Sequence, residues 1–194
     1  MPDRFDEAYY RRFYGSRDRV HGPREIARLA RGVTGLAAWW KQPIASVLDV
    51  GAGVGLWRDW FARHVPKARY RSIDVSAHAC LRYGHEQQDI ASFRAPEKFD
   101  LIICHSVLQY LADDAADCAI ENIGAMAAGL LYLEAITEGD LRAVLDRDRA
   151  DTTAYFRPAA FYCSRLVPHF QRIGAGLWAA RDSGPLFYEL EAEP

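Results

Sequence analysis

The stretch Val47-Leu48-Asp49-Val50-Gly51-Ala52-Gly53-Val54-Gly55-Leu56-Trp57 decides the fold of this chain. An apolar run breaks into three alternating glycines and then resumes as a helix-like sequence. This order predicts a buried strand, a tight turn and the start of a helix. Glycine lets the backbone of such a turn adopt positive φ, and it lets a ligand approach where a Cβ would collide. The turn therefore predicts a ligand-binding site at the end of the strand.

The spacing of the glycines narrows the class of ligand. A dinucleotide-binding turn follows the pattern G-x-G-x-x-G, and Leu56 stands where that pattern needs its third glycine. An acidic residue, Asp49, lies two positions before the first glycine. A carboxylate at this place would repel a pyrophosphate and attract an ammonium or sulfonium group. The spacing therefore favours S-adenosylmethionine over NAD.

The pattern Asp49-x-Gly51-x-Gly53-x-Gly55 resembles the first motif of the class I S-adenosylmethionine-dependent methyltransferases, D/E-x-G-x-G-x-G. The resemblance runs in ordered succession from about residue 46 to residue 137, and it extends to uncharacterised bacterial methyltransferase-domain proteins with a similar aromatic and arginine-containing N-terminus. It implies an α/β, Rossmann-like methyltransferase fold. Such a fold has a doubly wound, mainly parallel seven-stranded sheet with an antiparallel terminal strand.

Strand and helix patterns also alternate along the chain, which favours a mainly parallel sheet. Strands are expected at 45–50, 68–74, 86–90, 99–104 and 130–135, and helices at 5–14, 24–40, 55–65, 77–83, 113–127 and 159–166. Two last strands, at 169–179 and 185–191, are expected to form a hairpin around Asp182-Ser183-Gly184. We expect one domain over residues 1–194, with a helical cap (1–41), a cofactor-binding core (42–136), a lid or insert (137–168) and a terminal hairpin (169–194).

The composition argues against several classes of protein. The chain has 194 residues, of which 50% are hydrophobic, and this suits a single folded domain. Its net charge is −2 and it has no long run of Lys or Arg, so a nucleic-acid partner is not expected. The four cysteines are scattered, and no apolar run is typical of a signal peptide or a membrane span. We therefore expect a cytoplasmic protein without a membrane partner.

Polar side chains follow the predicted strands, at the edge where ligands bind in such sheets. The resemblance implies that the glycine turn contacts the methionine part of the cofactor and that Asp49 lies near its amino group. Asp74 can accept hydrogen bonds from ribose hydroxyls, because Ser76 is better placed to cap the next helix. In the family, a residue at the place of Asp89 often binds the adenine amine, while the next residue, here Ile90, covers the ring. The expected cofactor-binding residues are Asp49, Gly51, Ala52, Gly53, Gly55, Trp57, Asp74, Val75, Asp89, Ile90, Cys104 and His105.

The segment Cys104-His105-Ser106-Val107-Leu108 resembles the family segment that lies between cofactor and acceptor. His105 is the titratable group best placed to remove a proton, because histidine has an ordinary pKa of about 6.5. The alternative is that His105 is a hydrogen-bonded structural residue. The remaining histidines are expected on the surface or in packing, and these are His21, His64, His78, His85 and His169. Because no residue spacing is typical of metal ligands, no metal ion is expected.

Two aromatic segments are candidate lids over the site. Residues 9–15 and residues 151–157 carry aromatic and arginine side chains, which suit a small planar or anionic acceptor. The expected substrate or lid residues are Tyr9, Tyr14, Tyr110, Tyr155 and Arg157. The alternative is that the aromatic side chains seal the edge of the core.

The resemblance implies methyl transfer from S-adenosylmethionine to an O, N or C atom of a small-molecule acceptor. The reaction would be an in-line displacement that leaves S-adenosylhomocysteine. Two alternatives are a nucleic-acid or protein methyltransferase and a catalytically silent subunit that binds S-adenosylmethionine. The Asn/Asp-Pro-Pro-aromatic signature of base methylation is absent at the position of Cys104-His105-Ser106-Val107. The sequence indicates neither the acceptor nor the oligomeric state.

Overall fold

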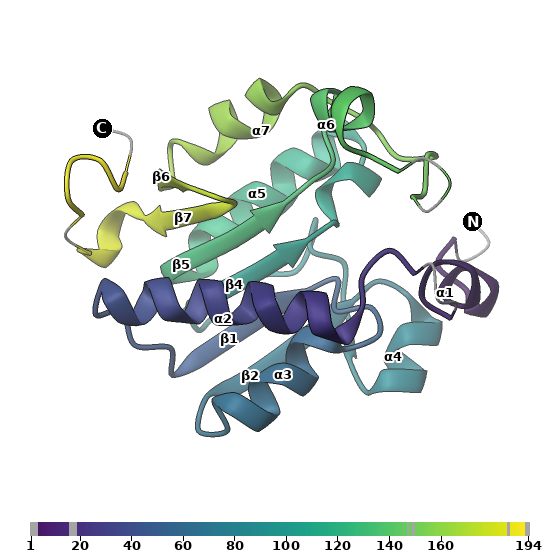
Figure 1. Cartoon of the computed structure of the whole chain (residues 1–194), viewed down its shortest axis with the longest axis horizontal. Helices are drawn as coiled ribbons and strands as arrows, with labels where there is room; N and C mark the ends of the chain where they lie inside the picture. The colour runs from purple at the N-terminus through teal and green to yellow at the C-terminus, as the bar shows by residue number, and fades with distance from the viewer. Residues whose placement is uncertain (1–3, 16–18, 147, 149, 186, 193–194) are drawn as a thin grey trace.

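A twisted sheet forms the centre of the molecule (Figure 1). The computed structural model describes residues 4–15, 19–146, 148, 150–185 and 187–192. Within these residues, seven strands pair in the order β3-β2-β1-β4-β5-β7-β6. The strands are β1 (Ser46–Val50), β2 (Arg69–Asp74), β3 (Glu86–Gln87), β4 (Phe99–His105), β5 (Ala127–Glu134), β6 (Phe170–Gly174) and β7 (Leu177–Ala180). Neighbouring strands are parallel from β3 to β5, whereas β7 is antiparallel to both β5 and β6. The expected mainly parallel sheet with an antiparallel last strand is confirmed.

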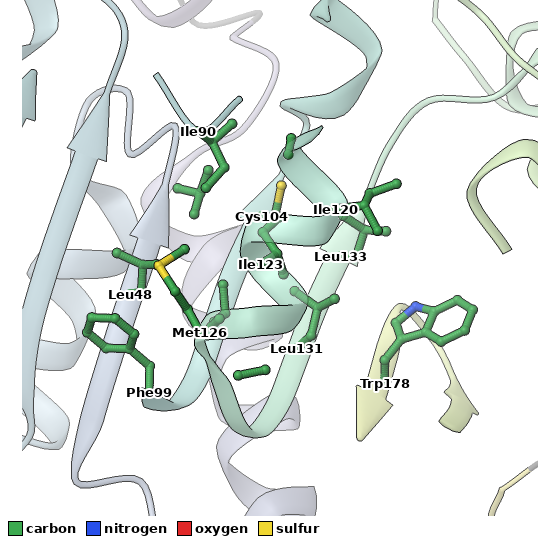
Figure 2. Close-up of a cluster of buried hydrophobic side chains, with 14 of the residues drawn as sticks. Leu48, Ile90, Phe99, Cys104, Ile120, Ile123, Met126, Leu131, Leu133 and Trp178 are labelled. Atoms are coloured by element: carbon green, nitrogen blue, oxygen red, sulfur yellow. The ribbon is translucent and has the colours of Figure 1, made fainter. Parts of the chain in front are cut away.

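The helices lie on both faces of this sheet. They are α1 (Glu7–Tyr14), α2 (Pro23–Trp39), α3 (Leu56–His64), α4 (Ala77–Tyr83), α5 (Asp113–Met126), α6 (Glu138–Ala143) and α7 (Ala159–Leu166), with 3-10 turns η1 (Leu108–Tyr110) and η2 (Arg181–Ser183). One apolar cluster packs between the sheet and α5 and α7, and a second packs between the opposite face and α2 and α3. Figure 2 shows part of the first cluster.

The environment of strand β4 explains why its sequence is continuously apolar. Leu101 and Ile103 point to the α2 and α3 side, whereas Ile102 and Cys104 point to the α5 and α7 side. All four side chains are fully buried, as expected for a parallel strand covered on both faces. Alternation between apolar and polar residues would have placed polar groups in one of the two cores.

The strand order creates a crevice at the carboxyl ends of β1 and β4. The chain passes from β1 to β2 on one side, whereas β4 pairs on the other side of β1. Such a reversal of strand order is where open α/β sheets bind ligands. In Figure 1, α1 lies beyond the end of the sheet toward which the arrows of β4 and β5 point. The sequence fragment that forms α1 is therefore placed near the predicted site.

The C-terminal region differs from the expectation. The chain turns at Gly174-Ala175-Gly176, so β6 and most of β7 occupy the range 169–179, where one strand was expected. All three turn residues have positive φ, and a Cβ on Gly176 would lie 3.0 Å from the Leu133 carbonyl oxygen. The strand expected at 185–191 is wrong, because the described residues there form no strand. Helix α6 also lies in the segment 137–157, for which no helix was expected, and β3 is shorter than expected.

Candidate active site

A cavity of about 230 Å³ opens at the carboxyl ends of β1, β2 and β4. We name it the strand-end cavity. Its wall includes the glycine turn after β1, acidic side chains after β2 and β3, and the segment after β4. The expected residues that line it are Gly51, Gly53, Asp74, Val75, Asp89, Ile90, His105, Tyr9, Tyr14 and Tyr110. Residues that the sequence places far apart thus surround one space.

The glycine turn is fixed against β2 and against the segment after β4. The backbone N–H groups of Gly51 and Ala52 both donate to the Ile73 carbonyl oxygen, at 2.9 and 3.1 Å. Gly51 has a φ of 65°, and a Cβ on this residue would lie only 2.4 Å from Cγ2 of Val107. Gly53 has a φ of 56°, and a Cβ on this residue would lie 3.9 Å from the Gly51 carbonyl oxygen, which is an ordinary contact. The turn therefore needs glycine for its conformation and, at Gly51, for space.

Asp74 connects the glycine turn to the start of α4. Its Oδ2 accepts from the Gly53 N–H at 2.8 Å, and its Oδ1 accepts from the Ser76 N–H at 2.8 Å. Ser76 caps α4 by accepting from the Ala79 N–H, as expected. Asp74 also lines the strand-end cavity.

Asp89 and Ile90 provide a polar and an apolar surface side by side. Asp89 Oδ1 accepts from the Ala91 N–H at 2.9 Å, while Ile90 is almost fully buried. Both residues line the strand-end cavity together with Asp74. An acceptor group for an exocyclic amine beside an apolar surface fits an adenine ring, and the Asp74 carboxylate fits a ribose. The residues present are thus compatible with an adenosyl group.

Five expected cofactor-binding residues lie outside the lining of this cavity, namely Asp49, Ala52, Gly55, Trp57 and Cys104. Asp49 is buried and accepts from the Tyr70 hydroxyl at 2.8 Å. Burial raises the pKa of Asp49 to about 7, although the hydrogen bond from Tyr70 opposes this shift. Cys104 lies in the core under α5, where burial raises the pKa of its thiol.

His105 is held from both sides at the end of β4. Its Nδ1 accepts from Trp57 Nε1 at 3.1 Å, and its Nε2 lies 3.2 Å from Oε1 of Glu134. Because an indole nitrogen can only donate, the proton of the neutral imidazole is at Nε2 and faces the carboxylate. Trp57, expected among the cofactor-binding residues, thus contacts His105 and does not line the strand-end cavity.

Glu134 and His21 are residues of this region that the sequence analysis missed. Glu134 also accepts a hydrogen bond from the Tyr132 hydroxyl at 3.0 Å. The centroids of the His21 and His105 rings lie 4.6 Å apart. Burial raises the pKa of Glu134, but hydrogen bonds, from His105 above all and from Tyr132, help to outweigh it and lower that pKa to about 2. Possible ligand atoms of His21, His105 and Glu134 lie within 4.8 Å of one another. In the arrangement described above, Nε2 of His105 carries the proton, so it offers no lone pair to a metal ion.

The second expected lid segment, residues 151–157, contacts the chain just before the first. Arg4 donates to Asp151 Oδ2 at 3.1 Å, which ties the chain before α1 to residues 151–153. The hydroxyl groups of Tyr9 and Tyr110 lie 3.1 Å apart at the cavity wall. Aromatic side chains from α1 therefore cover one side of the strand-end cavity.

Tyr155 and Arg157 do not line the strand-end cavity. Tyr155 is half exposed, whereas Arg157 is buried. The Arg157 guanidinium pairs with Asp113 at 2.8 Å and donates to the carbonyl oxygens of Leu108 and Leu111. Arg157 therefore stabilises the turn that follows β4 and lies away from the strand-end cavity.

A second cavity, of about 410 Å³, lies beside the first. We name it the side cavity. Ser106 lines both cavities, and its φ of 58° is unusual for a residue other than glycine. The other walls include His21 and Glu134, the α6 residue Asp140, and apolar side chains such as Ile136. A ligand in the side cavity would thus be next to a ligand in the strand-end cavity.

No described helix has the length and apolar character that a membrane span requires.

Comparisons with known proteins give this site a family context. A family model described as a methyltransferase domain matches residues 20–173. The solved N-methyltransferase NodS from Bradyrhizobium japonicum WM9, in complex with S-adenosyl-L-homocysteine, is 20% identical over 92% of this chain and 100% of that chain, with a TM-score of 0.64. A putative O-methyltransferase from Nostoc punctiforme PCC 73102 is 16% identical over 81% of this chain and 58% of that chain, with a TM-score of 0.57.

Some solved relatives are longer than this chain. An S-adenosylmethionine-dependent methyltransferase from Clostridium acetobutylicum ATCC 824 is 19% identical over 60% of this chain, with a TM-score of 0.49. The match covers 52% of that protein, so the chain spans about half of its length. No curated protein matches the sequence.

Proposed function

Because the chain belongs to the methyltransferase-domain family of class I enzymes, which use S-adenosylmethionine as methyl donor, we propose that it methylates a small molecule. The donor occupies the strand-end cavity and the acceptor occupies the side cavity. The observation that carries this proposal is the convergence of the glycine turn, Asp74 and Asp89 on one cavity, next to a second cavity that shares Ser106.

The proposal assigns a contact to each part of the donor. The backbone of Gly51 and Gly53 faces the methionine part, Asp74 binds the ribose hydroxyls, and Asp89 with Ile90 binds the adenine. When bound, the donor supplies a methyl group on a sulfonium ion that a nucleophile can displace in line. The protein has to align the acceptor and exclude water, since the methyl group is already activated. The aromatic side chains of α1 serve the second task because they cover the strand-end cavity.

A small molecule fits this arrangement better than a macromolecule. The side cavity has about 410 Å³, within the range of roughly 300–1,000 Å³ typical of small-molecule sites. The net charge of −2 gives no electrostatic support for a nucleic-acid substrate. A cytoplasmic location is part of the proposal, because all four cysteines are free, as is usual in a reducing compartment.

Thermal unfolding with S-adenosylmethionine or S-adenosylhomocysteine tests the donor site. A ligand present at 100 times its Kd stabilises the folded state by about 2.7 kcal/mol, so the unfolding temperature should rise. Asp89→Asn should weaken this effect, whereas Asp182→Asn, an exposed carboxylate in η2, is a matched control. If neither ligand raises the unfolding temperature at saturating concentration, the proposed function is wrong.

Turnover is tested separately. Release of S-adenosylhomocysteine should depend on a small-molecule acceptor from a screen, and mass spectrometry should find the acceptor heavier by one methyl group. Methylation of added protein or nucleic acid, with no small molecule modified, would assign the donor site to a different kind of transferase.

A further inference from the structure

Glu134 lies where the two cavities meet. It ends β5 directly opposite His105 of β4 in the register of the sheet. Its Oε1 lies 3.2 Å from His105 Nε2 and 3.4 Å from Ser106 Oγ, and both of these residues line the strand-end cavity. Glu134 itself lines the side cavity. An acceptor held in the side cavity therefore meets this carboxylate next to the donor site.

His105 is not arranged to remove a proton from the acceptor. Its Nδ1 lone pair accepts from Trp57, and its Nε2 carries a proton that is directed at Glu134. A neutral imidazole has no further lone pair in the ring plane. The position of His105 therefore suits orientation of Glu134, and not general-base catalysis.

Glu134 is not a general base for a hydroxyl group either. The hydrogen bond from His105 helps to hold its pKa at about 2 despite burial, so it is a carboxylate at neutral pH and a weak base. Its Oε2 accepts one hydrogen bond, from the Tyr132 hydroxyl, which leaves acceptor capacity on that oxygen. Glu134 can thus accept a hydrogen bond from a ligand without taking its proton.

These properties select among the chemical classes of acceptor. A hydroxyl or carbon acceptor needs a base to remove its proton in the reaction. A carboxylate or thiolate acceptor needs no base, but its negative charge would be repelled by Glu134. An amine in its free-base form is itself a nucleophile, and its N–H groups are donors that a carboxylate attracts.

On the premise of the proposed function, we propose that the acceptor is an amine whose N–H groups donate to Glu134, with His105 and Trp57 as positioning residues. The nitrogen lone pair forms the new N–C bond while the bond from methyl to sulfur breaks, and the electron pair of that bond stays on sulfur. The product is a methylated ammonium ion, and its proton passes to water. His21, whose ring centroid lies 4.6 Å from that of His105, also lines the side cavity, as do Asp140 and Asp146.

The state of His105 can be measured without an acceptor. Long-range ¹H–¹⁵N NMR of the full chain at neutral pH, with saturating S-adenosylhomocysteine, should show His105 protonated at Nε2 and unprotonated at Nδ1. Trp57→Phe removes the donor to Nδ1 and should shift the ring toward a mixture of the two tautomers. A proton on Nδ1 in the unaltered protein would overturn the proposal, because Nε2 would then be open to an acceptor or a metal ion.

The chemical class of the acceptor is tested with matched probes. Calorimetry with protein saturated by S-adenosylhomocysteine would compare 2-phenylethylamine, 2-phenylethanol and 3-phenylpropanoate, and likewise hexylamine, hexanol and hexanoate. The amine of each set should bind at least about 10-fold more tightly than its partners, as expected for hydrogen bonds to a charged group. Preference for an alcohol that is lost in His21→Asn would make His21 a base and overturn the proposal. A panel in which no amine binds would also overturn it.

Variants separate this inference from the donor site. Glu134→Gln should weaken amine binding about 10- to 100-fold, because a charged hydrogen-bond partner is lost. Glu138→Gln is the matched control, since this residue lies on the neighbouring helix α6 and lines neither cavity. Both variants should keep the thermal stabilisation by S-adenosylhomocysteine. An unchanged amine affinity in Glu134→Gln refutes the amine proposal alone, whereas a missing stabilisation in the unaltered protein refutes the proposed function.

Discussion

Replacing Gly51 by alanine tests the close contact between the turn after β1 and the segment after β4. The added Cβ would lie 2.4 Å from Cγ2 of Val107, far inside van der Waals contact. Valine is branched at Cβ, so Val107 can avoid the methyl group only by changing its rotamer or by moving with its backbone. Because Val107 lines the strand-end cavity, either movement changes the shape of the donor site.

The expected loss in the free energy of unfolding follows from two separate effects. Alanine at the φ of 65° observed for Gly51 costs about 1–2 kcal/mol. Insertion of a methyl group into a packed contact costs about 1–3 kcal/mol more. We therefore expect Gly51→Ala to lower the free energy of unfolding by about 2–5 kcal/mol. Gly84 provides the matched control, because it has a φ of 76° and no atom within 4 Å of its Cβ position. Gly84→Ala should lower the free energy of unfolding by only about 1–2 kcal/mol.

Urea unfolding followed by circular dichroism measures both variants, and calorimetry measures their affinity for S-adenosylhomocysteine. Gly51→Ala should bind this ligand more weakly, since each ~1.4 kcal/mol of lost binding free energy lowers the affinity tenfold. Gly84→Ala should bind it normally. If the two variants lose equal stability, then the contact with Val107 has no energetic importance and the reasoning about the turn is refuted.

Other parts of the structure can be tested with single substitutions. Gly32→Ala, in the exposed interior of α2 with open space at its Cβ, should raise the free energy of unfolding by about 0.5–1 kcal/mol in a urea titration; a loss would contradict the helix assignment. Burial raises the pKa of Asp49 from 3.8 to about 7, so the folded state keeps a proton that the unfolded chain releases, and stability should fall as pH rises through this window and stay low above it. Asp49→Asn should flatten this slope, and an equal slope in both proteins would disprove the role of Asp49. Arg157→Lys should lower the free energy of unfolding by about 1–3 kcal/mol, because one ammonium group cannot replace a guanidinium that pairs with Asp113 and donates to two carbonyl oxygens; an unchanged urea midpoint would show that the brace is dispensable.

The centre of the sheet could be predicted from the sequence because local pattern and tertiary environment agree there. The apolar runs of β1 and β4 are covered on both faces, so the pattern of hydrophobicity directly reports burial. At the C-terminus the local sequence pattern and the tertiary structure differ. The sequence pattern predicts one continuous strand over residues 169–179, but Gly174 and Gly176 allow a turn inside it. Gly184 has positive φ as expected for a turn residue, yet it follows η2 and does not connect two strands.

The strand ends of the site could be predicted for the same reason, whereas contacts between distant segments could not. Asp74 and Asp89 follow strands, and a parallel sheet brings such positions to one edge. His21 reaches His105 because residues 20 and 21, which precede α2, lie beside the ends of β4 and β5. No local periodicity encodes that path. Glu134 is the last residue of β5, so attention to the end of this strand could have found it.

In the proposed function, stability and donor binding depend on the same atoms of Asp74. Its two oxygens accept from the N–H groups of Gly53 and Ser76, so the carboxylate holds the glycine turn close to the start of α4. The turn can form without a ligand because these backbone donors are already satisfied. In the proposed function, the donor then meets the same carboxylate where it lines the strand-end cavity. A carboxylate that only bound ribose would be free to rotate and would lose side-chain entropy on binding, whereas Asp74 is already oriented by the fold. The acidic residue after β2 therefore contributes to affinity largely through the backbone that it organises.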